Sequence, residues 1–353
     1  MRRDFITNPG GDCIQAEATA RWLKIKYGVD VAFVTAERSI EEAFDLYHIF
    51  NLTRISNSFE VAEACVRSKM PYVLSPIWHS VDMMRKFYEP SLPFGIGLER
   101  YFGLRELFYE RFRLNKSVIS ASVSWKNAVD YVVMNSALVL PNSDDELREL
   151  EHYLNASIGK SMVVPNGLDV PVSMKKKALD KSKCYVCSGR VEPRKNTELV
   201  IRSFLASDAP AKGFCLIVLG AASKRHKGYF EKVMKYVDGV VVKYIPAVSY
   251  EDALRIYREA YGMIHASHFE TTGLVALEAL SLGCKVVMTQ ATYKDPYFLD
   301  YVEYCDPAVM ESIVNAINNT LSDPKSTPES AHFDSFSWER AADLTYQAYK
   351  MVN

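Results

Sequence analysis

Short apolar segments alternate with longer amphipathic segments in both halves of this chain, and this alternation limits its fold more than any other feature. Strands that alternate with helices form parallel sheets covered by helices, because each crossover returns the chain to the same edge of the sheet. The sequence therefore predicts an α/β fold with two doubly wound domains. We expect a helix over 16–27 and strands over 4–7, 30–35, 46–51, 72–75, 137–140, 185–186, 215–219, 240–245, 262–265 and 285–288.

The turn Pro165-Asn166-Gly167, followed by a polar stretch rich in lysine, is the expected hinge between the two halves. We predict one domain over 1–166 and a second over 167–335, with a final helix from Trp338 to Met351. A chain of 353 residues is long enough for two cores of ordinary size.

The overall charge points to no polyanionic partner. With 42 basic and 43 acidic residues, no net field favours nucleic acid or an anionic membrane. Seven cysteines without a paired framework indicate a reducing compartment, and Cys184 and Cys187 lack the second pair that a zinc site needs. No apolar run reaches about 18 residues and the N-terminus does not resemble a signal peptide, so we expect a cytoplasmic protein.

Two carboxylates, Glu270 and Glu278, flank a short polar run, a glycine and an apolar segment of helical character. The first turn of a helix has unpaired N–H groups and the positive end of its dipole, which suits a phosphate. Carboxylates repel phosphate but accept hydrogen bonds from hydroxyls. The stretch is therefore a candidate site for a nucleotide sugar; the alternative is an amphipathic helix that begins at a glycine.

Four segments in this order resemble the family-4 retaining glycosyltransferases, which have the two-domain GT-B fold of facing Rossmann-like domains. Glu270 and Glu278 match the E-x7-E element of that family. The other matching segments are 164–169, 188–196 and 336–339. The resemblance covers most of the chain and implies transfer of a sugar from a nucleoside-diphosphate donor with retention at the anomeric carbon. It also implies that the C-terminal segment 336–353 crosses back to the first domain.

By this resemblance, Arg190 and Lys195 clamp the diphosphate, Glu270 holds a hydroxyl of the sugar and Glu278 holds the ribose. Arg194, between the two cations, is set aside. The base would lie near Tyr244, Ile245 and Pro246, and the phosphates near the loop of Thr271, Thr272, Gly273 and Leu274. The family is usually metal-independent and uses no cofactor, and UDP or GDP is the expected donor nucleotide. Thr272 stands where the family commonly has an aromatic residue. The resemblance therefore does not assign one of the usual hexoses as the donor sugar.

In the first domain, Gly10 and Gly11 match the family's Gly-Gly loop, and His79 is a candidate for positioning the donor or acceptor. A ligand-free turn and a structural histidine are the alternatives. Two acidic residues, Asp144 and Asp145, lie between Ser143 and Glu146. They are better explained by a capping box formed by Ser143 and Glu146 than by a metal site. No metal ligand is predicted.

The acceptor stays open. The segment 85–116 mixes aromatic and basic side chains. An ordinary amphipathic helix that packs its aromatics inward explains this mixture best; the alternative is a surface for a glycan, a lipid-linked acceptor, the inner face of a membrane or a polymer such as nucleic acid. Two other functions remain: another GT-B enzyme, such as a nucleotide-sugar epimerase or a phosphorylase, and a catalytically silent subunit of a glycosylation complex.

Overall fold

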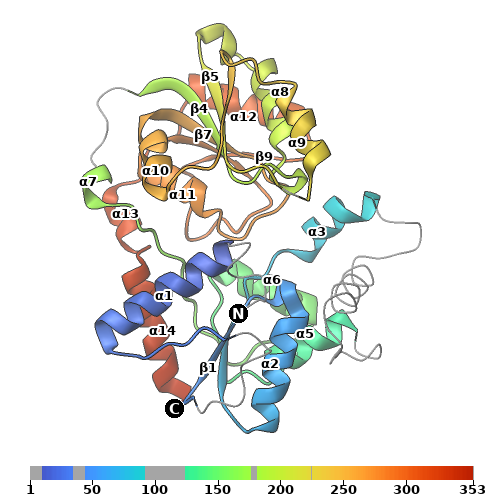
Figure 1. Cartoon of the computed structure of the whole chain (residues 1–353), viewed down its shortest axis with the longest axis vertical. Coiled ribbons are helices and arrows are strands. Elements are labelled where there is room, and N and C mark those ends of the chain that lie inside the picture. Colours follow the sequence, from blue (N-terminus) through green and yellow to red (C-terminus); the bar gives the residue numbers. More distant parts are fainter. Residues whose placement is uncertain (1–9, 35–43, 92–123, 176–180, 224, 353) are drawn as a thin grey trace. The chain divides into compact units, whose positions relative to one another are not determined.

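The computed structural model describes residues 10–34, 44–91, 124–175, 181–223 and 225–352. The chain forms two compact units (Figure 1). Unit 1 comprises Met1–Gly167 and Phe336–Asn353, and unit 2 comprises Leu168–Ser335. The expected strand over 4–7 and most of the aromatic and basic segment over 85–116 lie outside the described residues.

Among the described residues, unit 1 contains a parallel sheet of three strands in the order β1-β2-β3. Its strands are short because turn residues or helix starts follow each apolar run; the apolar faces of the surrounding helices then pack on the sheet. The strands are β1 (Tyr47–Phe50), β2 (Tyr72–Ser75) and β3 (Leu138–Val139). The helices are α1 (Gly11–Tyr27), α2 (Ile55–Arg67), α3 (Val81–Tyr88), α5 (Trp125–Met134), α6 (Asp144–Leu154) and α14 (Trp338–Val352), with 3-10 turns η1 (Leu52–Arg54) and η2 (Glu89–Ser91).

The C-terminal helix α14 packs against α1 in unit 1. The ammonium of Lys26 lies 2.7 Å from the carboxylate of Asp343, and the ring of Tyr27 stacks on that of Tyr346 with centroids 3.9 Å apart. Helices α1 and α14 therefore belong to one unit although most of the sequence separates them.

The strand expected over 30–35 is wrong for residues 30–34, which are irregular. Gly28 ends α1 in the left-handed conformation (φ 65°), and Val31 and Phe33 are exposed. Alternating apolar residues form a strand only beside a partner strand, and none of the described strands pairs with this segment.

Unit 2 contains a parallel sheet of six strands in the order β6-β5-β4-β7-β8-β9. The strands are β4 (Ser182–Ser188), β5 (Cys215–Leu219), β6 (Val242–Ile245), β7 (Ala260–His265), β8 (Lys285–Thr289) and β9 (Glu303–Cys305). Its helices and 3-10 turns are α7 (Val172–Lys175), η3 (Pro193–Lys195), α8 (Thr197–Ala206), η4 (Pro210–Lys212), α9 (Lys227–Met234), α10 (Tyr250–Glu259), α11 (Leu274–Ser281), α12 (Met310–Ser322) and α13 (Ser330–Asp334). The five strands expected in this half are present; the edge strand β9 is additional, and its three residues are too few for a pattern.

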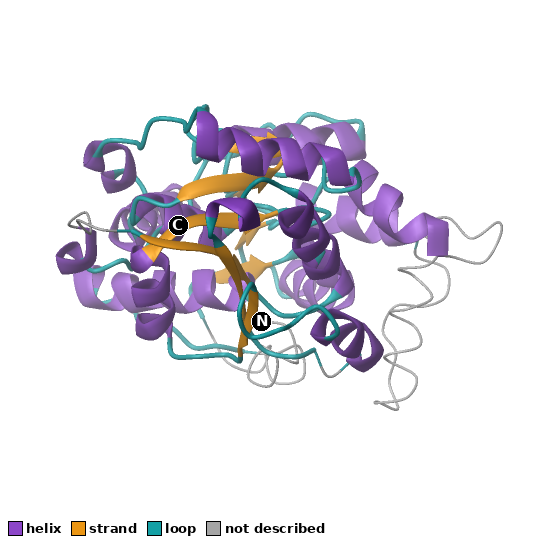
Figure 2. Ribbon diagram, turned by 90° about the horizontal axis from the view of Figure 1, so that it is seen from above, coloured by secondary structure: helices purple, strands orange, loops and turns teal. Residues whose placement is uncertain are grey.

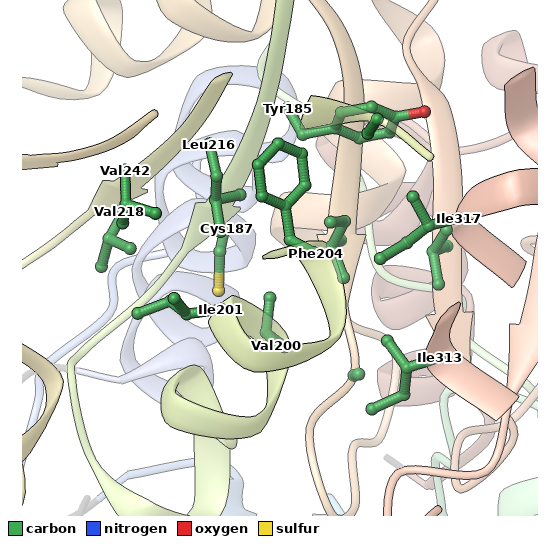
Figure 3. Packing of buried hydrophobic residues seen from close by; sticks show 14 of the residues in the cluster. Tyr185, Cys187, Val200, Ile201, Phe204, Leu216, Val218, Val242, Ile313 and Ile317 are labelled. Carbon is green, nitrogen blue, oxygen red and sulfur yellow. The ribbon is translucent and has the colours of Figure 1, made fainter. Parts of the chain in front are cut away.

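Helices cover both faces of this sheet: α8, α9 and α12 lie on one side, and α10 and α11 on the other (Figure 1). Figure 2 shows the strands between their flanking helices. Apolar side chains form most of the core on the α8 and α12 side, where Phe204 of α8 and Ile313 and Ile317 of α12 meet the strands (Figure 3). Burial of such side chains contributes about 2 kcal/mol each.

The strand order reverses between β4 and β7. From β4 the chain proceeds outward through β5 to β6, then returns to β7 on the other side of β4 and proceeds to β9. Helices on either side of such a switch point diverge from the carboxyl ends of the strands and leave a crevice there, which is where doubly wound sheets bind ligands.

A disulfide joins Cys184 of β4 to Cys215 of β5, so the expectation that no cysteines pair is wrong. The two residues are opposite each other in the parallel register, with Cα atoms 4.7 Å apart. The C-x-x-C spacing directed attention to Cys187, which is buried and free. The partner of Cys184 in the disulfide, Cys215, is 31 residues away in the sequence, and only the register of the sheet identifies it.

The predicted capping box is half present. Ser143 accepts a hydrogen bond from the N–H of Glu146, as expected. The carboxylate of Glu146 does not return to Ser143; it accepts from the backbone N–H groups of Asn142 and Trp78, each at 2.5 Å. It therefore fixes the segment after β2 to the start of α6.

Candidate functional site

The carboxyl ends of β4 and β7 bring Lys195 and Glu270 together at the switch point of unit 2. Asn196 fixes this arrangement: it adopts the left-handed conformation (φ 58°), and its side-chain amide donates to the carbonyls of Ala266, at 3.1 Å, and Pro307, at 2.7 Å. The loop after β4 is thereby tied to the end of β7. Lys195 lies in the 3-10 turn immediately before Asn196, and its ammonium contacts Oε1 of Glu270.

Three donors converge on that one oxygen. Besides Lys195, Arg194 Nη1 lies 3.2 Å from Oε1 of Glu270 and His265 Nε2 lies 3.3 Å from it. Among the described residues, no side chain or backbone group makes a hydrogen bond or ion pair with Oε2 of Glu270. The carboxylate is thus held by one oxygen, and the other can accept a hydrogen bond from a ligand.

Charge in this cluster is fixed by its surroundings. Burial alone would raise the pKa of Glu270, but Lys195 and Arg194 outweigh it and hold that pKa well below the usual range. Burial lowers the pKa of Lys195, against the attraction of Glu270. Burial also lowers the pKa of His265, so the imidazole is neutral near pH 7. The cluster is a carboxylate with two cations and a neutral imidazole.

The structure separates the two arginines that follow β4. Arg190 lies 3.7 Å from Glu192 and its side chain is 40% exposed, whereas Arg194, which the sequence analysis set aside, is the arginine beside Glu270. The turn at 193–195 directs the side chains of Arg194 and Lys195 to the end of β7. The role assigned to Arg190 stays a prediction.

The start of α11 lies within the loop between the two acids. Gly273 precedes the helix in the left-handed conformation (φ 69°), which favours glycine; a Cβ atom there would also lie 2.7 Å from Met288 Cε, so the end of that side chain would have to shift. Gly273 O accepts the first hydrogen bonds of the turn, from Ala276 and Leu277. The N–H of Leu274 therefore belongs to the first turn, whose donors have no partner within the helix.

The preceding residues of the loop are also fixed. Thr271 O accepts hydrogen bonds from the hydroxyl of Thr292, at 2.7 Å, and the N–H of Tyr293, at 3.3 Å. Thr272 is buried. The loop that carries Thr271, Thr272, Gly273 and Leu274 is therefore preformed beside Glu270.

Glu278 lies further along α11, buried, and its Oε1 accepts a hydrogen bond of 2.9 Å from the hydroxyl of Tyr250 at the start of α10. Burial raises the pKa of Glu278 to about 7, although the Tyr250 hydrogen bond opposes this rise, and the charge of Asp169 adds to it. Sequence reasoning did not identify Tyr250; its hydroxyl meets Glu278 only after α10 and α11 pack together.

Tyr244 and Ile245 end β6, and Pro246 follows them at the same edge of the sheet. The hydroxyl of Tyr244 donates to the carbonyl of Gly220, just after β5, at 3.0 Å. These residues lie two strands from β4, and they lie at the carboxyl ends of the strands, as Lys195 does. Their contact with a base stays a prediction.

In unit 1, Gly10 caps α1 and Gly11 begins it. A Cβ atom at Gly11 would meet nothing within 4 Å, so internal packing does not require glycine there. The N-terminal part of α1 is hydrogen-bonded to segments that follow two strands, since Asn51 donates to Asp12 at 3.0 Å and Gln15 donates to Asn142 at 2.9 Å.

His79 follows β2 and is half-buried, directly after Trp78, whose N–H is held by Glu146. The roles assigned to Gly10, Gly11 and His79 stay predictions. In the described part of the chain, no three His, Cys, Asp or Glu side chains are grouped closely enough to hold a metal ion. No helix among the described residues is long and apolar enough to cross a membrane.

The start of α11 lies beside cations and carboxylates at the switch point of a doubly wound sheet, which is where domains of this α/β class bind their ligands. Residues 169–348, just over half of the chain, match the family model described as glycosyl transferases group 1. The chain belongs to this family, as the resemblance predicted.

Characterised relatives and solved structures agree with this assignment. A D-inositol 3-phosphate glycosyltransferase of Geodermatophilus obscurus is 26% identical over 242 residues, which cover 62% of this chain and 54% of the relative. The O-antigen chain mannosyltransferase B of Escherichia coli is 26% identical over 170 residues, 46% of this chain and 45% of the relative. The chain thus spans about half the length of these relatives.

Among solved structures, Anabaena HepE in complex with UDP and glucose superposes with a TM-score of 0.67 at 15% identity, covering 97% of this chain and 96% of HepE. Sucrose-phosphate synthase of Thermosynechococcus elongatus gives a TM-score of 0.62 at 16% identity, covering 99% and 79%. The predicted fold class is confirmed: this is the α/β GT-B architecture, with a parallel sheet in each of two domains.

Proposed function

We propose that this chain transfers a sugar from a nucleoside-diphosphate donor to an acceptor. The observation that carries the proposal is the convergence of Lys195, Arg194 and Glu270 beside the start of α11. Two cations and a helix N-terminus can stabilise the charge that develops on a departing diphosphate. Relatives that are named glycosyltransferases, and neighbours solved with UDP, support the same reading.

The two acids have different tasks in this proposal. Glu270 is held through Oε1, so its Oε2 would accept a hydroxyl of the donor sugar. Glu278, held by Tyr250 through Oε1, would accept the ribose hydroxyls. Arg190 would assist Lys195 at the diphosphate, and Tyr244, Ile245 and Pro246 would face the base. Gly10, Gly11 and His79 keep the donor-binding and acceptor-binding roles that the resemblance implies.

Transfer would proceed with retention at the anomeric carbon and without a metal ion or cofactor, with UDP or GDP as the leaving group. The proposed acceptor is a glycan, a lipid-linked sugar or a polymer, and the proposed location is the cytoplasm, including the inner face of its membrane. Glu270 orients the donor in this account; it does not attack the anomeric carbon.

The test is a thermal-shift screen with UDP, GDP, ADP, dTDP and CMP, together with their common sugar conjugates. A nucleotide at about 100 times its Kd adds roughly 2.7 kcal/mol to the unfolding free energy. The identified donor is then incubated in EDTA with candidate acceptors, and NMR of the product determines the anomer. A shift with one base and a retained anomer support the proposal. A folded chain that responds to no nucleotide contradicts it, and binding without turnover favours a silent subunit.

A further inference from the structure

His265 occupies an unusual place for a histidine. It is the last residue of β7, follows the buried residues Met263 and Ile264, and is itself only 3% exposed. A buried polar ring is unfavourable unless it is hydrogen-bonded. Its Nε2 lies 3.3 Å from Oε1 of Glu270 and 3.5 Å from the hydroxyl of Ser267.

The same ring borders the helix start. A Cβ atom on Gly273 would lie 3.7 Å from both Cδ2 and Nε2 of His265. We call the segment from Glu270 to Glu278 the acid loop. The imidazole lies between the two parts of it that the proposed function uses, which are the carboxylate of Glu270 and the first turn of α11.

The three donors on Glu270 differ in freedom. Lys195 and Arg194 carry long side chains, 17% and 23% exposed, and they are the cations that a diphosphate would attract. His265 belongs to a central strand and its side chain is 2% exposed, so it cannot leave Glu270 for the phosphate. A carboxylate that shares its two cations with a ligand needs a fixed donor to keep its orientation.

We infer that His265 is a positioning residue, which donates from Nε2 to Glu270 and keeps Oε2 of that carboxylate aimed at the donor sugar while Lys195 and Arg194 engage the diphosphate. This inference rests on the proposed function. Misplacement of an orienting group by about 1 Å can lower turnover about 100-fold. Binding of UDP, which lacks the transferred sugar that would meet Glu270, should hardly depend on His265.

The experiment compares H265L, which keeps bulk and removes the donor, with H265Q, whose amide N–H can replace Nε2–H. Donor cleavage is followed with UDP-glucose, or with the conjugate that the nucleotide screen identifies, and UDP binding is followed by calorimetry. H48L is the matched control: His48 is a half-buried strand histidine of unit 1, with its ring nitrogens hydrogen-bonded to Tyr349 and Ser75.

We expect H265L to lower kcat about 100-fold with an unchanged Kd for UDP, and H265Q to recover most of the loss, while H48L keeps the parental kcat. If H265L does not fold, H265N replaces it, because the shorter amide does not reach Glu270. Parental turnover in H265L or H265N overturns the inference, and so does an H265Q variant as impaired as they are. A parent chain that binds no nucleotide overturns the proposed function first, and this inference with it.

Discussion

The ammonium of Lys195 contacts Oε1 of Glu270, although 75 residues separate them in the sequence. Both side chains are largely buried. The contact exists because β4 and β7 are neighbours in the sheet although β5 and β6 lie between them in the chain. The strand order thus converts two distant sequence motifs into one ion pair at the switch point.

This pair should be strongly coupled in folding. Lys195→Met leaves a buried carboxylate with fewer cations, and we expect it to lower the unfolding free energy by about 3 kcal/mol. Glu270→Gln should also destabilise, whereas the double variant should lose less than the sum of the two. Urea denaturation of the four proteins measures the coupling. Lys183→Met, on the exposed part of β4, is the control and should change little; strictly additive losses would show that the pair is not coupled.

Glu278 should make stability depend on pH near neutrality. Its pKa is about 7 in the folded chain and 4.5 for an ordinary glutamate, so between these values the folded state holds a proton that the unfolded state has lost. Unfolding free energy therefore falls as pH rises through this window, by roughly 3 kcal/mol from this group. Glu278→Gln removes the contribution, so we expect the variant to gain on the parent as pH rises.

The measurement is chemical denaturation of parent and Glu278→Gln at several pH values. Glu146 has a pKa raised to about 7 by burial as well, but it is present in both proteins and cancels in the difference. Tyr250→Phe supplies a second check, because loss of its hydrogen bond should move the pKa of Glu278 higher. A difference between parent and Glu278→Gln that is constant with pH would refute the assignment.

Glu146 should be a structural requirement of unit 1. Its carboxylate accepts from the N–H groups of Trp78 and Asn142, and Glu146→Ala leaves both buried donors without it. We expect a loss of about 3 kcal/mol or more in unfolding free energy, with a smaller loss for Glu146→Gln, whose amide oxygen still accepts. Thermal and urea denaturation compare the variants. Equal stability of Glu146→Ala and the parent would contradict this role.

The Cys184–Cys215 disulfide should stabilise unit 2. In the chain-entropy model, closing a loop of this length lowers the conformational entropy of the unfolded state and so raises the unfolding free energy by about 3–4 kcal/mol. Cys184→Ser with Cys215→Ser should lower stability by up to this amount, and the effect of reductant on denaturation should vanish in the variant. Peptide mapping without reduction tests the bond directly; free thiols at both positions would remove the basis of the prediction.

The sequence predicted the sheet of unit 2 well, because each buried strand is a short apolar run between turn residues. It predicted the acid loop because Glu270, Gly273 and Glu278 are close in the chain and each has a direct chemical reason. Groups that meet only through tertiary structure were harder. The contact of Arg194 with Glu270 depends on the turn at 193–195, and the pairing of Cys215 with Cys184 depends on the register of two strands.

His265 shows the same difficulty from another side. Within an apolar strand, a histidine is indistinguishable from an ordinary core residue until its Nε2 is found beside Glu270. The segment 30–34 shows the opposite error, since its alternating pattern suits a strand but no described strand adjoins it. Periodicity predicts what a segment can form, and its neighbours decide whether it does.

The most direct test of the central claim, that the residues at the carboxyl ends of β4 and β7 bind a nucleoside-diphosphate sugar, is calorimetric titration of UDP-glucose and GDP-mannose into the parent, Lys195→Ala and Lys183→Ala. The account predicts saturable binding of one donor by the parent and by Lys183→Ala, and at least about a tenfold loss of affinity in folded Lys195→Ala, equivalent to about 1.4 kcal/mol. Equal affinity in all three proteins would contradict it.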